Sequence, residues 1–168
     1  LGSALHILKI GFVDAIKIIM GVSLIGSVIF TYFWLSRLFS VTASIVGALF
    51  ALYVPYHLYD AYTRGSVGEL FALLWVPFIL WMIERKSIVL ISVGIALLIL
   101  SHNTLALCFL PILFVYALLR KTLPWKALVG SFVLGAGLSS FFIIPALFEI
   151  HNTVFSQTTV SNPLEYFA

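Results

Sequence analysis

Apolar residues form six long runs along the chain, and short stretches with charges and turn residues separate them. The runs cover residues 15–36, 41–56, 67–83, 87–101, 104–119 and 127–148. A helix needs about 20 residues to cross a bilayer core of roughly 30 Å, with a lower limit near 17. The first and last runs meet this easily, and packing or local bilayer thinning can accommodate the short fourth run. Lipid offers the backbone no hydrogen-bond partners, so we predict an all-α transmembrane bundle of about six spans.

The composition leads to the same class of protein. Of the 168 residues, 62% are hydrophobic and 9% are charged, and the mean hydropathy is +1.18. A soluble domain has about a quarter of its residues charged, so this chain cannot cover its own surface with polar groups. We therefore predict one integral membrane domain over residues 1–168, with the lipid bilayer as its main partner.

Two other classes of function are excluded by the charge pattern and the cysteine content. The net charge is +3, and the basic residues are spread over connections without forming a patch, so we expect no nucleic-acid partner. Cys108 is the single cysteine, which rules out an intramolecular disulfide and a cysteine-based zinc site.

The two ends of the sequence lead to a separate expectation. The chain begins with Leu1, and no charged segment precedes an apolar core with a cleavage site. We therefore expect an internal piece of a longer protein, with residues 1–14 as an interfacial segment on the outer side of the membrane.

Basic residues predict which side of the membrane each connection faces. The connections after the first, third and fifth runs contain six of them: Arg37, Arg85, Lys86, Arg120, Lys121 and Lys126. The connections after the second, fourth and sixth runs contain only Arg64, although Lys9 and Lys17 lie on that same side. Because cytoplasmic loops are enriched in Lys and Arg, we predict that the six-residue side is cytoplasmic and the Arg64 side is outer.

Small residues recur every four positions in two of the runs. They are Ala43, Gly47 and Ala51 in the second run, and Ser131, Gly135 and Ser139 in the sixth. This spacing lets helix backbones approach each other closely, so we predict a packed bundle whose outer connections converge.

The polar residues of the outer connections are the candidates for substrate binding. They are His57, Asp60, Arg64 and Glu69 in the first connection, His102 and Asn103 in the second, and Glu149 after the last run. The planar guanidinium of Arg64 suits phosphate. An acid such as Asp60 or Glu149 can hold sugar hydroxyls, coordinate a divalent cation or act as a base. No metalloprotease, P-loop or nucleophile-elbow spacing is present, so we assign no metal site and no catalytic residue.

Each candidate in the first connection also has a simpler structural interpretation. Asp60 and Arg64 are four residues apart and can form an ordinary helical ion pair. Ser66 and Glu69 match the capping-box pattern, in which both side chains satisfy free N–H groups at a helix start.

The same applies to the other outer connections. His102 and Asn103 can form only a tight turn, with Asn103 or Thr104 capping the next helix. Glu149 ends an apolar run, where the helix dipole disfavours a negative charge, so its position is more suggestive of function.

Three longer elements resemble those of a known family. They are PYHLYDAYTRGSVGE at 55–69, ILSHNTLALCFLP at 99–111 and LGAGLSSFFIIPALFE at 134–149. They resemble, in this order, elements of the bacterial and archaeal membrane proteins called 6-pyruvoyl-tetrahydropterin synthase-related, and the resemblance covers about residues 14–167. That group is in turn similar to the class C (GT-C) glycosyltransferases.

The resemblance implies a multispanning transferase of the cytoplasmic membrane that uses a polyprenyl-phosphate-linked sugar on the extracytoplasmic side. It does not imply pterin chemistry, because the soluble synthase builds a histidine zinc site on a β-rich fold. The catalytic carboxylate of such transferases usually lies in a large first outer loop, which we expect upstream of Leu1. The alternative functions are a non-catalytic membrane scaffold and a transporter of lipid or solute.

The predicted topology can be tested with thiol labelling of the full-length protein in a Cys108→Ser background. Cysteines placed at Arg64 and Asn103 should react with a membrane-impermeant reagent added outside intact cells, whereas a cysteine at Lys86 should react only after lysis. Labelling of the Arg64 and Asn103 positions from the cytosol alone would overturn the orientation.

Overall fold

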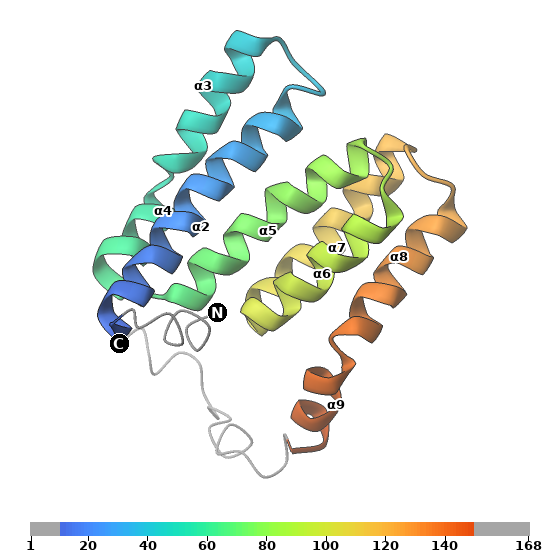
Figure 1. The fold of residues 1–168 in the computed structure, drawn as a ribbon. Helices are drawn as coiled ribbons and strands as arrows, with labels where there is room; N and C mark the ends of the chain where they lie inside the picture. The colour runs from blue at the N-terminus through green and yellow to red at the C-terminus, as the bar shows by residue number, and fades with distance from the viewer. Residues whose placement is uncertain (1–10, 150–168) are drawn as a thin grey trace, which may run out of the picture.

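The structure, a computed structural model, describes residues 11–149, and all regular elements in that range are helical (Figure 1). This confirms the predicted all-α bundle. The helices are α2 (Phe12–Leu35), α3 (Val41–Leu52), α4 (Pro55–Tyr59), the π-helical turn η1 (Asp60–Arg64), α5 (Val67–Glu84), α6 (Ile88–Ser101), α7 (Asn103–Arg120), α8 (Trp125–Leu138) and α9 (Ser140–Glu149).

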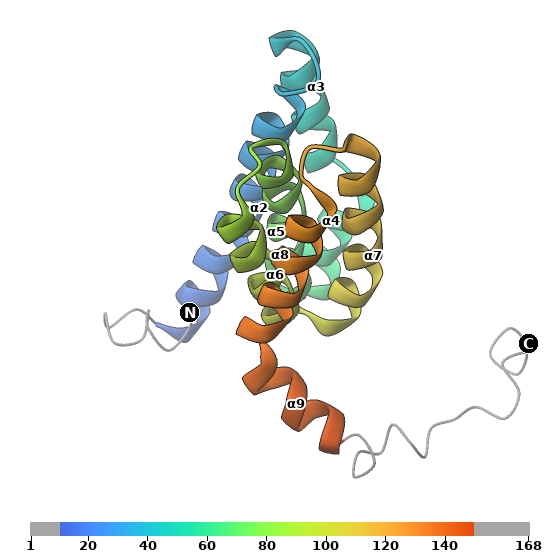
Figure 2. The same cartoon turned by 90° about the vertical axis from the view of Figure 1, so that its right-hand side faces the viewer.

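The long helices pack as a row with one helix behind it. In the row, α3 contacts α2, α2 contacts α5, α5 contacts α6 and α6 contacts α8, while α7 packs against α5 and α6 (Figures 1 and 2). The tightest part of the core lies between α5, α6 and α7, where the side chains of Ile79, Ile83, Ile91, Leu98 and Leu113 are almost fully buried. Many other large apolar side chains are exposed, as expected for helices that face lipid.

The six predicted runs all coincide with helices, but they do not give six straight spans. Among the described helices, α2, α5 and α7 are long and apolar enough to cross a membrane. The count reaches five if two bent pairs each form one span, α3 with α4–η1 (bent by 41°) and α8 with α9 (bent by 68°). α6 is a shorter apolar helix of 14 residues. These helices identify the chain as a membrane protein.

Both breaks have local causes. Pro55 has no N–H to donate to the carbonyl of Ala51, so the helix of the second run ends at Leu52 and restarts as α4. In the last run, the Ser139 hydroxyl bonds back to the carbonyls of Gly135 and Ala136, and such bonds bend helices. The run at 127–148 is therefore a bent pair of helices and not one straight helix.

The small residues of α8 mediate packing as predicted, and those of α3 do so only in part. Gly135 lies against Ile95 of α6, and the Ser92 hydroxyl donates to the Ser131 carbonyl at 2.9 Å. In α3, Gly47 faces Leu35 of α2. Ala43 is exposed, because the packed stripe of α3 runs through its neighbour Ser44 instead.

The connections that hold the six basic residues all lie at the upper end of the bundle in Figure 1. At the lower end of the bundle in Figure 1, α4 and η1, which form the first outer connection, lie beside the turn between α6 and α7. We call this lower end the outer end, after the sequence-based prediction. Phe12 to Asp14, the last residues of the predicted interfacial segment, form the first turn of α2. Residues 1–10 lie outside the described range.

Substitution of Gly135 tests the α6–α8 contact. A Cβ at this position would lie 2.7 Å from Ile95 Cβ and 2.9 Å from the Ser92 carbonyl oxygen. We expect Gly135→Ala to lower the free energy of unfolding by about 1–3 kcal/mol through overpacking. Gly130→Ala on the same helix meets no atom within 4 Å and should not be destabilising. SDS titration of the purified protein measures both, and equal stabilities would contradict the contact.

Candidate functional site

The first outer connection folds back onto the start of α5. η1 ends at Arg64, and the next residue, Gly65, has a φ of +62° in the left-handed region that favours glycine. The N–H of Ser66 then donates to the carbonyl of Asp60 at 3.2 Å and closes the turn. This reversal places Tyr56, Asp60 and Arg64 against the first turn of α5.

Glu69 is the centre of the group that results. Its carboxylate accepts a hydrogen bond from the Tyr56 hydroxyl and a two-pronged ion pair from Arg64, with Nη1 to Oε2 at 3.0 Å and Nη2 to Oε1 at 2.9 Å. The Glu69 side chain is 7% exposed, whereas that of Arg64 is 45% exposed. The carboxylate is thus buried beneath a guanidinium that still faces solvent.

Asp60 adds a second carboxylate to the same guanidinium. Its side chain is fully buried, Oδ1 lies 3.4 Å from Arg64 Nη1, and Oδ2 has no hydrogen-bond partner among the described residues. One guanidinium therefore faces two carboxylates. Burial, together with the negative charge of Glu69 beside it, raises the pKa of Asp60 above its ordinary value.

His102 brings the second outer connection to this group. It is the single residue between α6 and α7, and its Nδ1 accepts a hydrogen bond from the Leu105 N–H at 3.3 Å. In the neutral ring Nε2 therefore bears the proton, and this atom lies 3.7 Å from Glu69 Oε1. We call Tyr56, Asp60, Arg64, Glu69 and His102 the outer cluster.

The structure unites four of the seven predicted site residues: Asp60, Arg64, Glu69 and His102. His57 points elsewhere, because its Nδ1 donates to the Ala51 carbonyl at 2.9 Å. Asn103 is exposed at the start of α7 and forms no part of the outer cluster. Glu149 ends α9, and its side chain lies outside the described part of the chain.

The simpler interpretations of these residues have mixed outcomes. The Asp60–Arg64 pair is confirmed, although the shorter contacts of Arg64 go to Glu69. The capping box was wrong, since the Ser66 side chain makes no capping bond and Glu69 turns towards Arg64 and Tyr56.

The tight turn between α6 and α7 is confirmed, but its predicted cap was wrong. His102 caps α7, where we expected Asn103 or Thr104. An imidazole that uses Nδ1 as the cap acceptor presents its other nitrogen to Glu69, so the cap itself orients His102 in the outer cluster.

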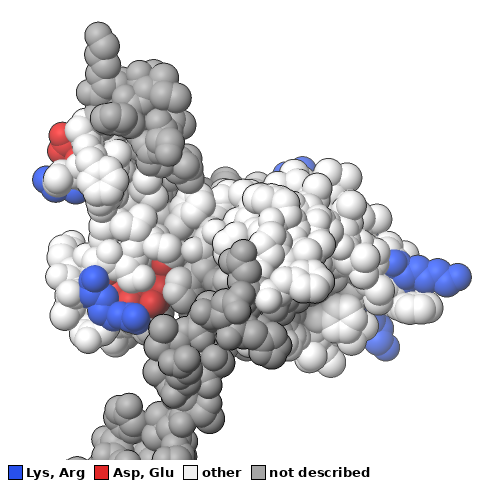
Figure 3. Space-filling view, turned by 90° about the horizontal axis from the view of Figure 1, so that it is seen from below, with Lys and Arg blue, Asp and Glu red and all other residues white. Residues whose placement is uncertain are grey.

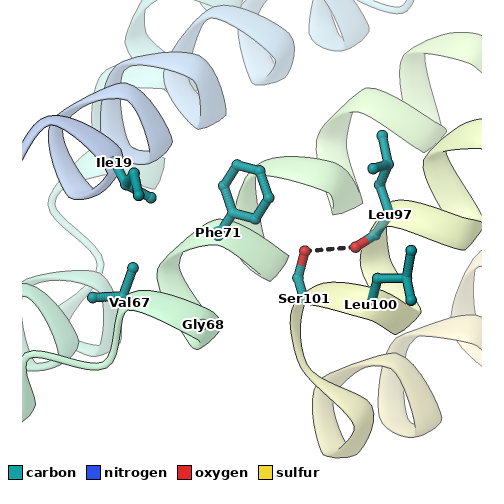
Figure 4. Close-up of a pocket in the computed structure, with 7 residues that line it drawn as sticks. All are labelled: Ile19, Val67, Gly68, Phe71, Leu97, Leu100 and Ser101. Atoms are coloured by element: carbon teal, nitrogen blue, oxygen red, sulfur yellow. Dashed lines mark hydrogen bonds between the residues drawn. The ribbon is translucent and has the colours of Figure 1, made fainter. Parts of the chain in front are cut away.

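An apolar groove begins beside the outer cluster and runs between α2, α5 and α6 (Figure 4). Its first part, of about 260 Å³, is lined by Ile19, Val67, Gly68, Phe71, Leu97, Leu100 and Ser101. A second part of about 660 Å³ shares Ile19, Phe71 and Leu97 and continues along the helices to Phe30. A Cβ at Gly68 would lie 3.7 Å from the His102 ring, so His102 lies close both to the end of the groove and to Glu69.

Sequence reasoning missed a second polar group at the opposite end of α5. The Glu84 carboxylate accepts from Arg120 Nε at 2.8 Å and Nη2 at 3.0 Å, and also from the Tyr116 hydroxyl. Trp34 Nε1 donates to the Tyr116 hydroxyl at 2.9 Å. We call these four residues the inner cluster. The usable signal was Glu84, the one acid beside a predicted basic connection.

Charged atoms are few on the face seen from below. Acidic and basic atoms lie together on the left side of this view, and basic atoms without acidic neighbours lie on the right (Figure 3). Within residues 11–149, no group of three or more His, Cys, Asp or Glu side chains is arranged to hold a metal ion. The divalent cation that we considered from the sequence stays a prediction.

Comparison with protein-family models, curated proteins and solved structures finds no significant match to this chain. The resemblance to the 6-pyruvoyl-tetrahydropterin synthase-related proteins thus stays a prediction. The function of the outer cluster is argued below from its own chemistry.

Carboxyl-to-amide substitutions separate the roles of the two acids. Asp60→Asn should change the free energy of unfolding by less than about 1 kcal/mol, because Oδ2 lacks a partner and a neutral side chain suits the buried position. Glu69→Gln should cost roughly 2 kcal/mol, since it weakens hydrogen bonds from Tyr56 and Arg64 to a charged acceptor. SDS titration of both variants is the measurement, and a larger loss for Asp60→Asn would contradict this assignment.

Proposed function

We propose that the chain is the membrane region of a GT-C-like glycosyltransferase of the cytoplasmic membrane. The outer cluster would bind the phosphate of a polyprenyl-phosphate-linked sugar on the extracytoplasmic side. The observation that carries this proposal is the guanidinium of Arg64, which Glu69 holds in place and which lies half exposed beside a lipid-facing groove.

Phosphate is the group that this guanidinium suits best. Arg64 points Nη1 and Nη2 at Glu69, and its remaining N–H groups are free to bind a phosphate oxygen from the exposed side. The ion pair with Glu69 fixes the orientation of the side chain in advance, so less conformational entropy is lost on binding. The Nε2–H of His102 supplies a second donor close by.

The groove supports a lipid-linked donor over a soluble one. Its walls are apolar, and two of the three helices that line it, α2 and α5, are long enough to span the bilayer. The groove ends at Gly68 and Ser101 next to His102. A prenyl chain can enter it sideways from the lipid, which leaves the attached phosphate at the outer end of the bundle. The sugar would then lie near Asp60, whose carboxyl group can accept or donate a hydrogen bond to hydroxyls.

The transporter alternative fits the described helices less well. Transporters place ionisable residues near the middle of the bilayer, often where helices are broken. Here the acids of both clusters belong to η1 and to the two ends of α5, and among the candidate site residues only His57 lies against the middle of α5.

The scaffold alternative has one observation in its favour. The inner cluster repeats the Tyr–Glu–Arg arrangement of the outer cluster, so either group can serve simply to hold helices together. A test of function therefore has to treat the two arginines as a matched pair.

Arg64→Ala in the full-length protein should reduce the sugar-transfer activity of the folded protein by on the order of 100-fold, as expected for loss of a charged contact to phosphate. Arg120→Ala, the matched control, should leave the specific activity of the folded protein unchanged. Transfer from a radiolabelled polyprenyl-phosphate sugar in membranes gives the readout. Full activity of Arg64→Ala would remove Arg64 from the site, and equal losses for both variants would favour the scaffold.

A further inference from the structure

A further pocket lies between α2, the end of α3, α4 and α5, and it shares Trp34 with the inner cluster. It measures about 200 Å³, and its apolar wall includes Leu73, Val76, Pro77 and Leu80 of α5. Ala51 of α3, His57 of α4 and three residues of α2 with polar groups, Ser27, Thr31 and Trp34, complete the lining. The function proposed above does not use this pocket.

The break before α4 determines how His57 faces the pocket. Pro55 cannot donate to the carbonyl of Ala51, and the Nδ1–H of His57 donates to that carbonyl instead, at 2.9 Å. This bond places the proton of the neutral ring on Nδ1, so Nε2 is left with a lone pair. Nε2 is buried and has no hydrogen-bond partner among the described residues.

The other polar groups of the wall have already used their donors. The Ser27 hydroxyl donates to the Leu24 carbonyl, the Thr31 hydroxyl donates to the Ser27 carbonyl, and Trp34 Nε1 donates to Tyr116. What these side chains still offer are acceptor lone pairs. Pro77 adds to this excess of acceptors over donors, because it has no N–H to donate to the carbonyl of Leu73. Both residues lie on the part of α5 that lines the pocket.

We propose that this pocket is a binding site for a small apolar alcohol, whose hydroxyl donates to Nε2 of His57. A ligand without a donor would leave Nε2 unsatisfied, and an ammonium would bring a full charge to a pocket whose lining contains no carboxylate. The carbon chain of the alcohol occupies the apolar part of the pocket along α5.

Water alone suits the pocket less well. The volume has room for several water molecules, each of which takes up about 30 Å³ in the liquid and needs two to four polar partners. The residues on the α5 side of the pocket are apolar, so most of these molecules would lack partners there. A ligand with one hydroxyl group on an apolar carbon chain matches the unpaired Nε2 of His57 and the apolar rest of the pocket.

The test compares hexan-1-ol with 1-methoxypentane, an isomeric ether that has no O–H donor. In the full-length protein, purified in detergent and labelled with ¹⁵N-histidine, hexan-1-ol should shift the Nε2 resonance of His57, and the ether should not. The alcohol should also bind about three- to tenfold more tightly than the ether, which is the factor that one neutral hydrogen bond contributes.

His57→Asn is the matched variant, because its amide N–H lies near the position of Nδ1 and can still donate to Ala51 while Nε2 is absent. It identifies the His57 resonance and should bring the alcohol-to-ether affinity ratio to about one. Val76→Phe, which fills the pocket, should abolish binding of both probes. Equal affinities of the wild-type protein for both probes, or an Nε2 resonance that hexan-1-ol leaves unchanged because water is the sole occupant, would overturn the proposal. If His57→Asn does not fold, the alcohol-to-ether affinity ratio of the wild-type protein still decides the question.

Discussion

Two buried carboxylates on one helix organise this bundle. Glu69 in the first turn of α5 and Glu84 at its last residue are each almost enclosed, and each is bound by one tyrosine and one arginine. An ionised carboxylate at the edge of a bilayer is costly unless it is paired, so each glutamate requires partners from other segments. The contacts of Glu69 hold α4 and η1 against α5, and those of Glu84 hold α7 against α5. The central helix of the row is thereby held at both ends.

The inner and outer clusters differ in which polar groups remain without a partner once each glutamate is paired. In the inner cluster, one carboxylate meets one guanidinium, and the Tyr116 hydroxyl is satisfied by Trp34 and Glu84. The outer cluster has the additional carboxylate of Asp60, a buried oxygen without a partner among the described residues, and an imidazole N–H close to Glu69. Unsatisfied polar groups destabilise a purely structural contact, and they are useful where a polar ligand supplies the missing partners. This difference is the reason for placing function at the outer end.

Prolines have a role in this structure that hydropathy does not reveal. Pro55 ends α3 and leaves the Ala51 carbonyl free, His57 satisfies that carbonyl, and the opposite nitrogen of the ring becomes a buried acceptor. From the sequence alone, His57 counted as one more polar residue of the outer connection. The orientation of its ring depends on which backbone carbonyl lacks a hydrogen-bond donor. The residues next to His57 in the sequence therefore gave no indication that its side chain would point away from Arg64 and into the bundle.

The amino-acid sequence by itself determined the class of fold, the positions of the apolar helices and the division of charge between the two ends, because hydrophobic length and charge are local properties of a segment. It also supplied the Asp60–Arg64 pair, because four residues make one helical turn. The tertiary structure decided which polar groups meet. Glu69 pairs with Arg64 and does not form a capping box with Ser66, and His102, which belongs to another connection, lies beside Glu69. Glu84 pairs with Arg120, which lies 36 residues further along the sequence. These contacts follow from the directions of side chains on packed helices, and a one-dimensional pattern of polar and apolar residues does not contain those directions.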